Sequence, residues 1–281
     1  MDKNIAILCN ADAGAGRAVM VSGKIDEGLV KKNIAHSLFK EAWPNHFNNF
    51  TDIFIVGGDG TLNYFINKYP GIKLPLVIFN GGTGNDFHWV LYADKTLEEQ
   101  FQIALNEKPK SIDIGKCNEN YFINGVGIGF EGAVANALTG KKKRPGKTSF
   151  LITILKKIIT YRSKNYLIRS GELGLTGKKL LVDISNGRRA GGGFHIAPEA
   201  KANDGLFDII IADALNLFQR LRYLPVIEKG KHMNLSFIHH FRTGKITIES
   251  NEPVQFHLDG EYGKAQKLEI EILPGALNFR Y

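Results

Sequence analysis

The sequence is poor in cysteine and has no long apolar run. Its 281 residues include two cysteines, Cys9 and Cys117, which form neither a metal-type pair nor a disulfide framework. This usage fits a reducing cytoplasm. No stretch approaches the ~18 apolar residues of a membrane span, and Asp2 and Lys3 before a short apolar run do not indicate a signal peptide. We therefore expect a cytoplasmic chain of two modest domains or one large one.

Acidic residues are missing from one segment, 141–169, which holds ten lysine or arginine residues. The positive charge of this segment alone is therefore larger than the net charge of the whole chain, which is +8. A basic patch attracts phosphate in lipid headgroups, nucleotides or nucleic acid. Its aromatic residues follow no stacking-platform pattern, so nucleic acid is not an expected partner. Residues 150–159 have amphipathic spacing, which favours a helix docked on its own domain over direct membrane insertion.

Three glycine-rich loops each follow a short apolar run. The runs are Ile5–Leu8, Ile53–Val56 and Leu76–Phe79, and the loops are CNADAGAG at 9–16, GGDGT at 57–61 and NGGTGND at 80–86. Apolar runs ended by glycine predict buried parallel strands that enter tight turns. Ligands bind at the carboxyl ends of such strands, and glycine lets backbone N–H groups approach phosphate oxygens. The pattern therefore predicts a protein that handles nucleotides.

The two halves of the chain differ in pattern. The first ~110 residues alternate strands with helices, which is typical of βαβ units. The predicted helices there are 61–69, 86–91 and 96–106. After Pro109 the predicted strands are 112–116, 121–124, 180–185, 206–211, 245–249, 254–258 and 268–272, with helices at 149–162 and 214–224. We expect an α/β domain followed by a β-rich domain, with a cleft between them.

Three other patterns favour structural interpretations. GIGFEG at 127–132 fits a dinucleotide motif, but no acid follows about 20 positions later, so we interpret it as a glycine-permissive turn near the active cleft. GKKKRPGKT at 140–148 has five residues between its glycines where a P-loop needs four, and it follows no strand. His239 and His240 are adjacent and lack accompanying ligands, which indicates ordinary polar positions.

The second loop and several later segments resemble a known family. GGDGTLN at 57–63 is similar to the signature of the diacylglycerol kinase catalytic domain, in particular of the soluble bacterial diacylglycerol kinase-like lipid kinases, although GGDGT also occurs in NAD kinases. The further matches are GTGNDF at 82–87, NGRRAGGGFHIAPEAKANDGLFD at 186–208, FHLDGE at 256–261 and EIEILPGALNFR at 269–280. They occur in order over nearly the whole chain.

The resemblance implies a fold class and domain limits. An α/β, Rossmann-like domain of the NAD kinase and diacylglycerol kinase type would occupy residues 1–111 and bind the nucleotide. A β-sandwich domain would occupy residues 112–273. A C-terminal segment, 274–281, would return to the first domain. ATP would lie in the cleft between the two domains.

The resemblance also implies roles for single residues. Asp59 would hold Mg²⁺ against the phosphates, and Glu261 would act as the base that accepts the proton of a lipid hydroxyl. The nucleotide contacts would be Asn10, Gly57, Gly58, Asp59, Gly60, Thr61, Leu62, Asn63, Thr83 and Asn85. A second, structural Mg²⁺ would be bound by the side chain of Asp204 and the carbonyl groups of Lys201 and Leu206.

Simpler interpretations exist for some of these positions. Asp59 or Asp86 would serve only as a helix cap, and Glu261 only as a turn residue. The chain also departs from the family pattern. Ala11 stands where the family has proline, Tyr64 stands where it has glutamate, and Phe39 lies nearest the position of its threonine.

We interpret the chain as an ATP- and Mg²⁺-dependent lipid kinase acting on diacylglycerol or a related lipid. It would be cytoplasmic and associate peripherally with an anionic membrane surface, and a homodimer is left open. One alternative is a kinase for another acceptor, such as a sphingoid base, phosphatidylglycerol or a soluble hydroxyl compound. The other is a catalytically weak module that binds nucleotide or lipid.

Overall fold

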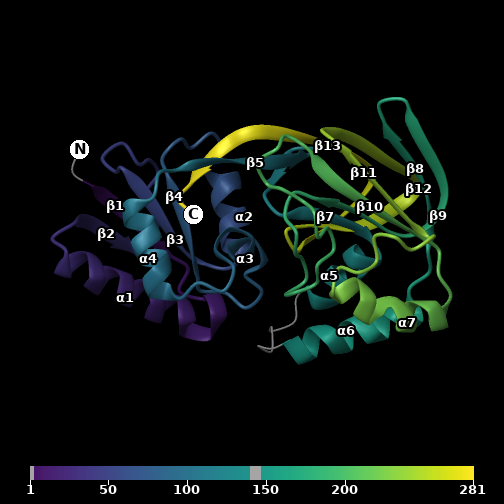
Figure 1. Cartoon of the computed structure of the whole chain (residues 1–281), viewed down its shortest axis with the longest axis horizontal. Coiled ribbons are helices and arrows are strands. Elements are labelled where there is room, and N and C mark those ends of the chain that lie inside the picture. The colour runs from purple at the N-terminus through teal and green to yellow at the C-terminus, as the bar shows by residue number, and fades with distance from the viewer. Residues whose placement is uncertain (1–2, 140–146) are drawn as a thin grey trace. The chain divides into compact units, whose positions relative to one another are not determined.

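A computed structural model describes residues 3–139 and 147–281 (Figure 1). Two compact units make up this chain: the first runs to Ile112 and takes in Gly275–Tyr281, and the second is Asp113–Pro274. GKKKRPGKT at 140–148 falls mostly outside the described residues, as do Lys141, Lys142, Lys143 and Arg144 of the basic segment. Among the described helices, none combines the length and the apolar character needed to cross a membrane.

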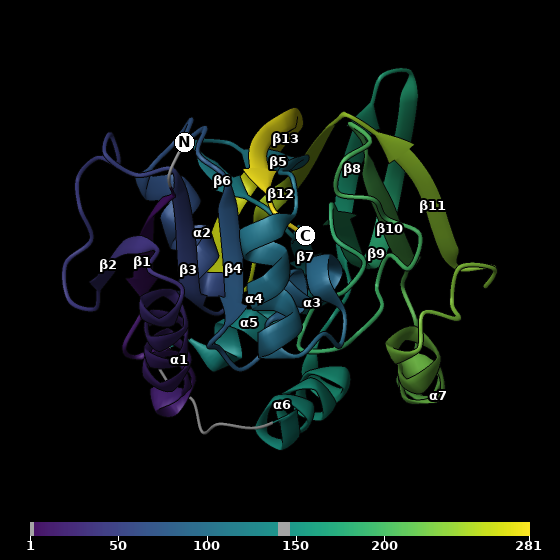
Figure 2. The same ribbon diagram turned by 60° about the vertical axis from the view of Figure 1, so that its left-hand side comes forward.

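The first unit is built on a parallel sheet. Its elements are β1 (Asn4–Cys9), a 3₁₀ turn (Ala13–Gly16), α1 (Arg17–Lys31), β2 (Ala35–Phe39), β3 (Asp52–Gly57), α2 (Asp59–Lys68), β4 (Leu76–Asn80), α3 (Asp86–Tyr92) and α4 (Leu97–Asn106). The strand order is β4-β3-β1-β2 (Figure 2), and the end of β13 (Glu261–Phe279) joins β4 in parallel through Phe279 and Leu76. All six residues of β3 are buried, as expected for a strand covered on both faces.

The connections of this sheet leave its middle strands in opposite directions. The chain passes from β1 through α1 to β2 on one side, and from β3 through α2 to β4 on the other side. This reversal creates a topological switch point at the carboxyl ends of β1 and β3, where open α/β sheets bind their ligands. The first two glycine-rich loops begin there, and the third follows β4, the neighbour of β3.

The second unit is mostly antiparallel. Its elements are β5 (Lys110–Cys117, which starts in the first unit), β6 (Asn120–Phe122), β7 (Gly125–Gly129), α5 (Phe130–Leu138), α6 (Lys147–Thr160), β8 (Lys164–Ser170), β9 (Leu173–Ser185), β10 (Phe207–Asp213), α7 (Leu217–Glu228), β11 (Ile238–Thr243), β12 (Lys245–Leu258) and most of β13. The strands follow the order β11-β10-β9-β7-β12-β13, while β8 pairs with β9 and β12. Strand β5 pairs with β6 and β13.

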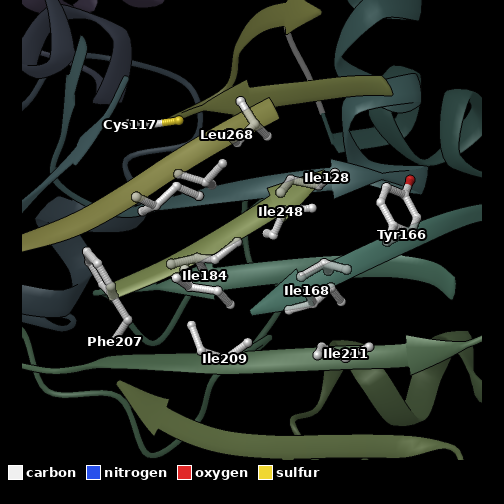
Figure 3. Close-up of a cluster of buried hydrophobic side chains, with 14 of the residues drawn as sticks. Cys117, Ile128, Tyr166, Ile168, Ile184, Phe207, Ile209, Ile211, Ile248 and Leu268 are labelled. Carbon is white, nitrogen blue, oxygen red and sulfur yellow. The ribbon is translucent and has the colours of Figure 1, made fainter. Parts of the chain in front are cut away.

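Alternating strands fill the core of the second unit (Figure 3). Leu268 and Ile270 of β13 are fully buried, while Glu269 between them faces outward, which confirms the alternation predicted for residues 268–272. Phe122 and Phe207 stack with ring centroids 5.5 Å apart. The apolar faces of β7, β8, β9, β10 and β12 close around them.

The predicted turn at GIGFEG is wrong. Residues 127–129 complete β7, and α5 begins at Phe130, so the motif joins a strand to a helix. Gly132 explains part of the glycine pattern, because a Cβ there would collide with the backbone of Gln255 and Phe256 in β12. The motif therefore allows a helix to pack closely on a strand.

Candidate functional site

The three glycine-rich loops of the first unit pack backbone against backbone. A Cβ on Gly14 would collide with the carbonyl oxygen of Gly81, and one on Gly82 would collide with the Cα of Gly58. The N–H of Gly81 donates to the carbonyl of Gly57 over 2.9 Å. These glycines are thus required for contact between loops, in addition to any approach of a ligand. Any side chain here would push the loops apart.

Asp59 joins the second loop to the third. It is the first residue of α2, and its carboxylate accepts hydrogen bonds from the backbone of another helix, α3. The N–H of Asp86 donates to Oδ2 over 3.1 Å, and the N–H of Phe87 donates to Oδ1 over 3.0 Å. A carboxylate at a helix N-terminus satisfies N–H groups that lack partners within the helix and interacts favourably with the helix dipole.

Other predicted contact residues complete this scaffold. Asn10 Nδ2 donates to Thr61 Oγ1 over 2.9 Å, which links the first loop to α2. Asn85 has φ of +56°, and its Oδ1 accepts from the N–H of Gly82 over 2.9 Å. The side chain of Leu62 is fully buried in α2, so only its main chain is available to a ligand. The structure therefore brings the predicted residues of the first unit together at the loops.

Further polar groups lie at the start of α2 and in the third loop. The N–H groups of Asp59 and Gly60, the first two of α2, have no acceptor within the helix and are suited to phosphate oxygens. Thr83 is exposed in the third loop, and Asn63 is half-buried on α2. The site thus combines a helix N-terminus with hydroxyl and amide groups at the switch point of the sheet.

The site can accommodate a magnesium ion through one carboxylate. Asp59 is half-buried, and a carboxylate has about four lone-pair positions, of which the two N–H donors take two. Mg²⁺ in phosphate-transfer sites is commonly held by one or two carboxylates, water and the phosphates themselves. Across residues 3–139 and 147–281, no three His, Cys, Asp or Glu side chains form a metal-binding group on their own. The donor set therefore fits an ion that arrives with a nucleotide.

A sharp turn in the second unit carries Glu261. Asp259 has φ of +49° and Gly260 has φ of +91°, and the exposed Glu261 follows as the first residue of β13. The carboxylate of Asp259 accepts from the N–H groups of Ile123, Asn124 and Gly125 over 2.8, 2.8 and 2.9 Å. Asp259 therefore anchors the turn to the start of β7. Sequence reasoning missed this role, although the D-G-E pattern itself indicates a turn.

The predicted structural magnesium site does not fit the arrangement of its residues. The carboxylate of Asp204 forms an ion pair with the Arg242 guanidinium, and its Oδ1 accepts from the N–H of Leu206 over 3.2 Å. Arg242 Nε also lies 3.5 Å from Oδ2 of Asp208, whose side chain is buried. The carboxylate that would bind the metal ion with the carbonyl groups of Lys201 and Leu206 is thus already paired with a guanidinium cation. We derive no step through a structural magnesium ion.

Two departures from the family pattern place aromatic rings near the first unit's loops. Tyr64 on α2 is 55% exposed and meets Trp43 edge-on, with ring centroids 5.6 Å apart. Phe39 ends β2 and meets Phe50 edge-on at 6.0 Å. Neither side chain offers the carboxylate or the aliphatic hydroxyl of the family pattern. His239 and His240, as expected, have separate partners, Asp213 and Asp208.

Comparison with known proteins gives the family. Residues 4–117 match the diacylglycerol kinase catalytic domain, and residues 124–280 match the YegS C-terminal NAD kinase beta sandwich-like domain. The chain belongs to this family of diacylglycerol kinase-like lipid kinases. Its two-domain architecture is therefore a diacylglycerol kinase catalytic domain followed by a β-sandwich-like domain.

Individual relatives agree with this assignment. The "Probable lipid kinase YegS-like" protein of Shewanella frigidimarina is 29% identical over 83% of this chain and 77% of its own length. The "Diacylglycerol kinase" of Bacillus subtilis is 28% identical over 76% of this chain and 72% of its own length. The crystal structure of a diacylglycerol kinase from Bacillus anthracis matches with a TM-score of 0.75 at 22% identity, covering 100% of this chain and 97% of that one, which shows the fold.

Arg242→Met should destabilise the second unit, because it leaves Asp204 and the buried Asp208 without their cation. The expected loss is about 1–3 kcal/mol, measured by urea unfolding. Lys245→Met, which removes a cation 3.8 Å from the exposed Glu271, should change stability by less than about 0.5 kcal/mol.

Addition of EDTA tests the predicted structural magnesium site. EDTA should leave the melting temperature of the nucleotide-free protein unchanged. A clear drop on EDTA addition that Asp204→Ala abolishes would restore the metal site and contradict the ion-pair account.

Proposed function

We propose that this chain is an ATP- and Mg²⁺-dependent lipid kinase that transfers the γ-phosphate to a hydroxyl of diacylglycerol or a related lipid. Family membership supports phosphate transfer to a lipid. The observation that carries the proposal is the junction of three loops around Asp59 at the switch point of the parallel sheet. Such a junction suits a triphosphate, because fixed N–H groups and a carboxylate meet where sheet ligands bind.

The residues of the first unit would divide the work of nucleotide binding. The N–H groups at the start of α2 and the hydroxyl of Thr83 would contact phosphate oxygens. Asp59 would hold Mg²⁺ while it continues to bind the N-terminus of α3. When bound, the ion neutralises charge on the phosphates. Asn10 and Thr61 would act through the loops that they hold in place.

Glu261 would accept the proton of the attacking lipid hydroxyl. The motivation is its position in the rigid Asp259–Glu261 turn and its exposed carboxylate. Phosphoryl transfer needs little covalent chemistry from the protein, so a positioned base and fixed charges supply most of the catalysis. Asp259, whose carboxylate is bound to three backbone N–H groups, would serve the turn and not the proton transfer.

The proposed partner is an anionic membrane surface, approached through helices α6 and α7. Figure 1 shows these two helices in the second unit. Arg220 of α7 links α7 to the end of α6 by donating to the carbonyl groups of Ile158 and Tyr161 over 3.1 and 2.7 Å. Ile154 and Ile158 anchor α6 on α5. Phe150 and Leu224 also pack against this cluster. Seven other apolar side chains of the two helices are exposed: Leu151, Ile152, Leu155, Ile159, Leu217, Phe218 and Leu221.

Charge supports a lipid surface as the partner of these helices. Lys156, Lys157 and Arg162 lie on or beside α6, and residues 141–169 contain no acidic residue. Each such cation near an anionic bilayer contributes roughly 1 kcal/mol to the binding free energy. Exposed apolar side chains contribute further when their surface moves out of water into the bilayer. The docked-helix prediction for residues 150–159 is confirmed for Ile154 and Ile158, while the other face stays available.

Asp59→Asn should lower turnover of ATP and lipid on the order of 10²–10³-fold, because it removes the charge that would hold the ion. It should also lower the melting temperature, since an amide oxygen replaces only one of the two acceptors of the α3 N–H groups. Asp94→Asn in an exposed turn of the same unit is the matched control and should change neither. Near wild-type turnover by Asp59→Asn, assayed well below its melting temperature, would disprove the role.

Glu261→Gln should lower the rate of lipid phosphorylation by about 10²–10⁴-fold and leave ATP affinity unchanged. The amide preserves shape but cannot accept the proton, so the loss belongs in kcat. Single-turnover kinetics measure the chemical step, and Glu252→Gln, also exposed in the second unit, is the control. A variant within a few-fold of wild type would place the base elsewhere.

Vesicle co-sedimentation tests the membrane surface. Binding should require anionic lipid and weaken as salt rises, since the Debye length falls from ~10 Å at 0.1 M to ~3 Å at 1 M. Replacing Ile159 and Phe218, 68% and 72% exposed, by Ser should reduce pelleting several-fold. Met20→Ser with Val30→Ser, which removes exposed apolar side chains of α1, is the control. Equal pelleting with neutral vesicles, or no effect of the Ile159 and Phe218 changes, would contradict the proposal.

A further inference from the structure

A row of three paired residues crosses the second unit behind the Asp259–Glu261 turn. Strand β7 pairs with β12 on one side and with β9 on the other, and the register places His257, Gly127 and Asp183 opposite one another. Directly paired residues of neighbouring strands face the same side of the sheet. The two polar side chains therefore flank a position that has no side chain.

Glu131 fills the space over Gly127. It lies in the first turn of α5, and its Oε2 is 3.6 Å from Nε2 of His257. A Cβ on Gly127 would collide with both the carboxylate and the imidazole. The glycine of the GIGFEG motif thus makes room for a cluster of three titratable groups. The register of β7 and β9 brings Asp183 to the same face, where Ser185 Oγ donates to Asp183 Oδ1, while Oε2 of Glu131 is buried and has no hydrogen-bond partner among the described residues.

Burial determines how this cluster holds its protons. Asp183 is 1% exposed, and burial followed by the charge of Glu131 raises the pKa of Asp183 well above its usual value. Burial raises the pKa of Glu131 to about 7. Two adjacent buried carboxyl groups are least costly when one of them is protonated and donates to the other. Burial also lowers the pKa of His257, which favours the neutral imidazole against the attraction of Asp183 and Asp259.

The neutral imidazole has a specific task. The N–H of Gly260, the middle residue of the Asp259–Glu261 turn, donates to Nδ1 of His257 over 3.2 Å. Nδ1 can accept only when it carries no proton, so the proton of the ring lies on Nε2, on the side of Glu131. Protonation of His257 would put a hydrogen on Nδ1 and break the bond to the turn.

We propose that Glu131, Asp183 and His257 form a buried proton-sharing cluster that holds the Asp259–Glu261 turn through Nδ1 of His257. His257 and Glu131 are then positioning residues for Glu261. The catalytic consequence rests on the proposed function of Glu261, whereas the structural consequence does not.

Backbone NMR of the whole chain tests the structural part without any substrate. Between pH 5 and 8, the Gly260 amide signal should shift with the same midpoint as the ring protons of His257, below the ordinary histidine value of 6.5. In His257→Asn, an amide oxygen takes the place of Nδ1, so the Gly260 signal should no longer titrate. His239→Asn, which changes a histidine facing Asp213, should leave the Gly260 titration intact.

Kinetics test the catalytic part with ATP and a short-chain diacylglycerol. The wild-type kcat should fall on the acid side with the midpoint of His257, and His257→Asn should remove that limb while staying within a few-fold at pH 7.5. His257→Leu lacks the acceptor and should lower kcat by about 10–10²-fold with KM for ATP unchanged. If the Gly260 signal titrates with His257 but kcat is the same in His257→Asn, His257→Leu and the wild type, the cluster is supported and the proposed role of Glu261 is contradicted. A Gly260 amide that does not titrate, or a protonated Nδ1 at neutral pH, would overturn the inference.

Stability against pH offers a second measurement. Glu131 binds its proton more tightly in the folded chain than in the unfolded chain, so its contribution is complete below about pH 4.5 and is lost as the pH rises through about 7. The urea midpoint should therefore fall between pH 5 and 8, and Glu131→Gln should reduce this fall. Glu252→Gln, whose carboxylate pairs with Lys164 at the surface, should not. An undiminished fall in Glu131→Gln would contradict proton sharing.

Discussion

The carboxylate of Asp59 is the interaction on which the first unit's loops depend. It starts one helix and accepts hydrogen bonds from the first two N–H groups of another, so the second and third loops are fixed to each other. Because the side chain serves two helix ends at once, its charge is held at a defined point at the edge of the sheet. A proposed metal-binding carboxylate thus has its geometry set by a structural contact.

Glycine plays a related part in both units. Gly81 and Gly82 let loops of the first unit touch along their backbones, and Gly127 and Gly132 let a helix, a carboxylate and an imidazole approach a strand in the second. In each case the missing Cβ is replaced by protein atoms. A glycine-rich motif therefore need not mark a ligand, and its neighbours decide which atoms use the space.

Much of the fold followed from the sequence because its signals are local. The apolar runs before the three loops, the helices after the second and third loops and the alternating strand at 268–272 were predicted and are confirmed. Helix α1 and strands β2, β8 and β11 were not predicted. Strand β7 and helix α5 were missed because a glycine-rich stretch indicated a turn. The Rossmann-like description of the first domain and the roles of Asp59 and Glu261 stay predictions.

The contacts within the site depended on tertiary structure. Nothing in GGDGT indicates that Asp59 caps a helix starting at residue 86, and nothing in the 201–206 segment indicates that Arg242 pairs with Asp204. Such pairings join residues about 30 to 40 positions apart, and sequence spacing carries no signal for them. The family resemblance indicated which residues belong to the candidate site, and the structure showed which contacts position them.

Transfer of phosphate from ATP to lipid is the central claim, and a labelled-nucleotide assay measures it directly. Purified protein would be incubated with γ-³²P-ATP, Mg²⁺ and mixed vesicles containing one candidate acceptor at a time: diacylglycerol, a sphingoid base or phosphatidylglycerol. The account predicts label in the organic phase with diacylglycerol or a closely related glycerolipid, dependent on Mg²⁺. Binding of ATP without label in any lipid would contradict it.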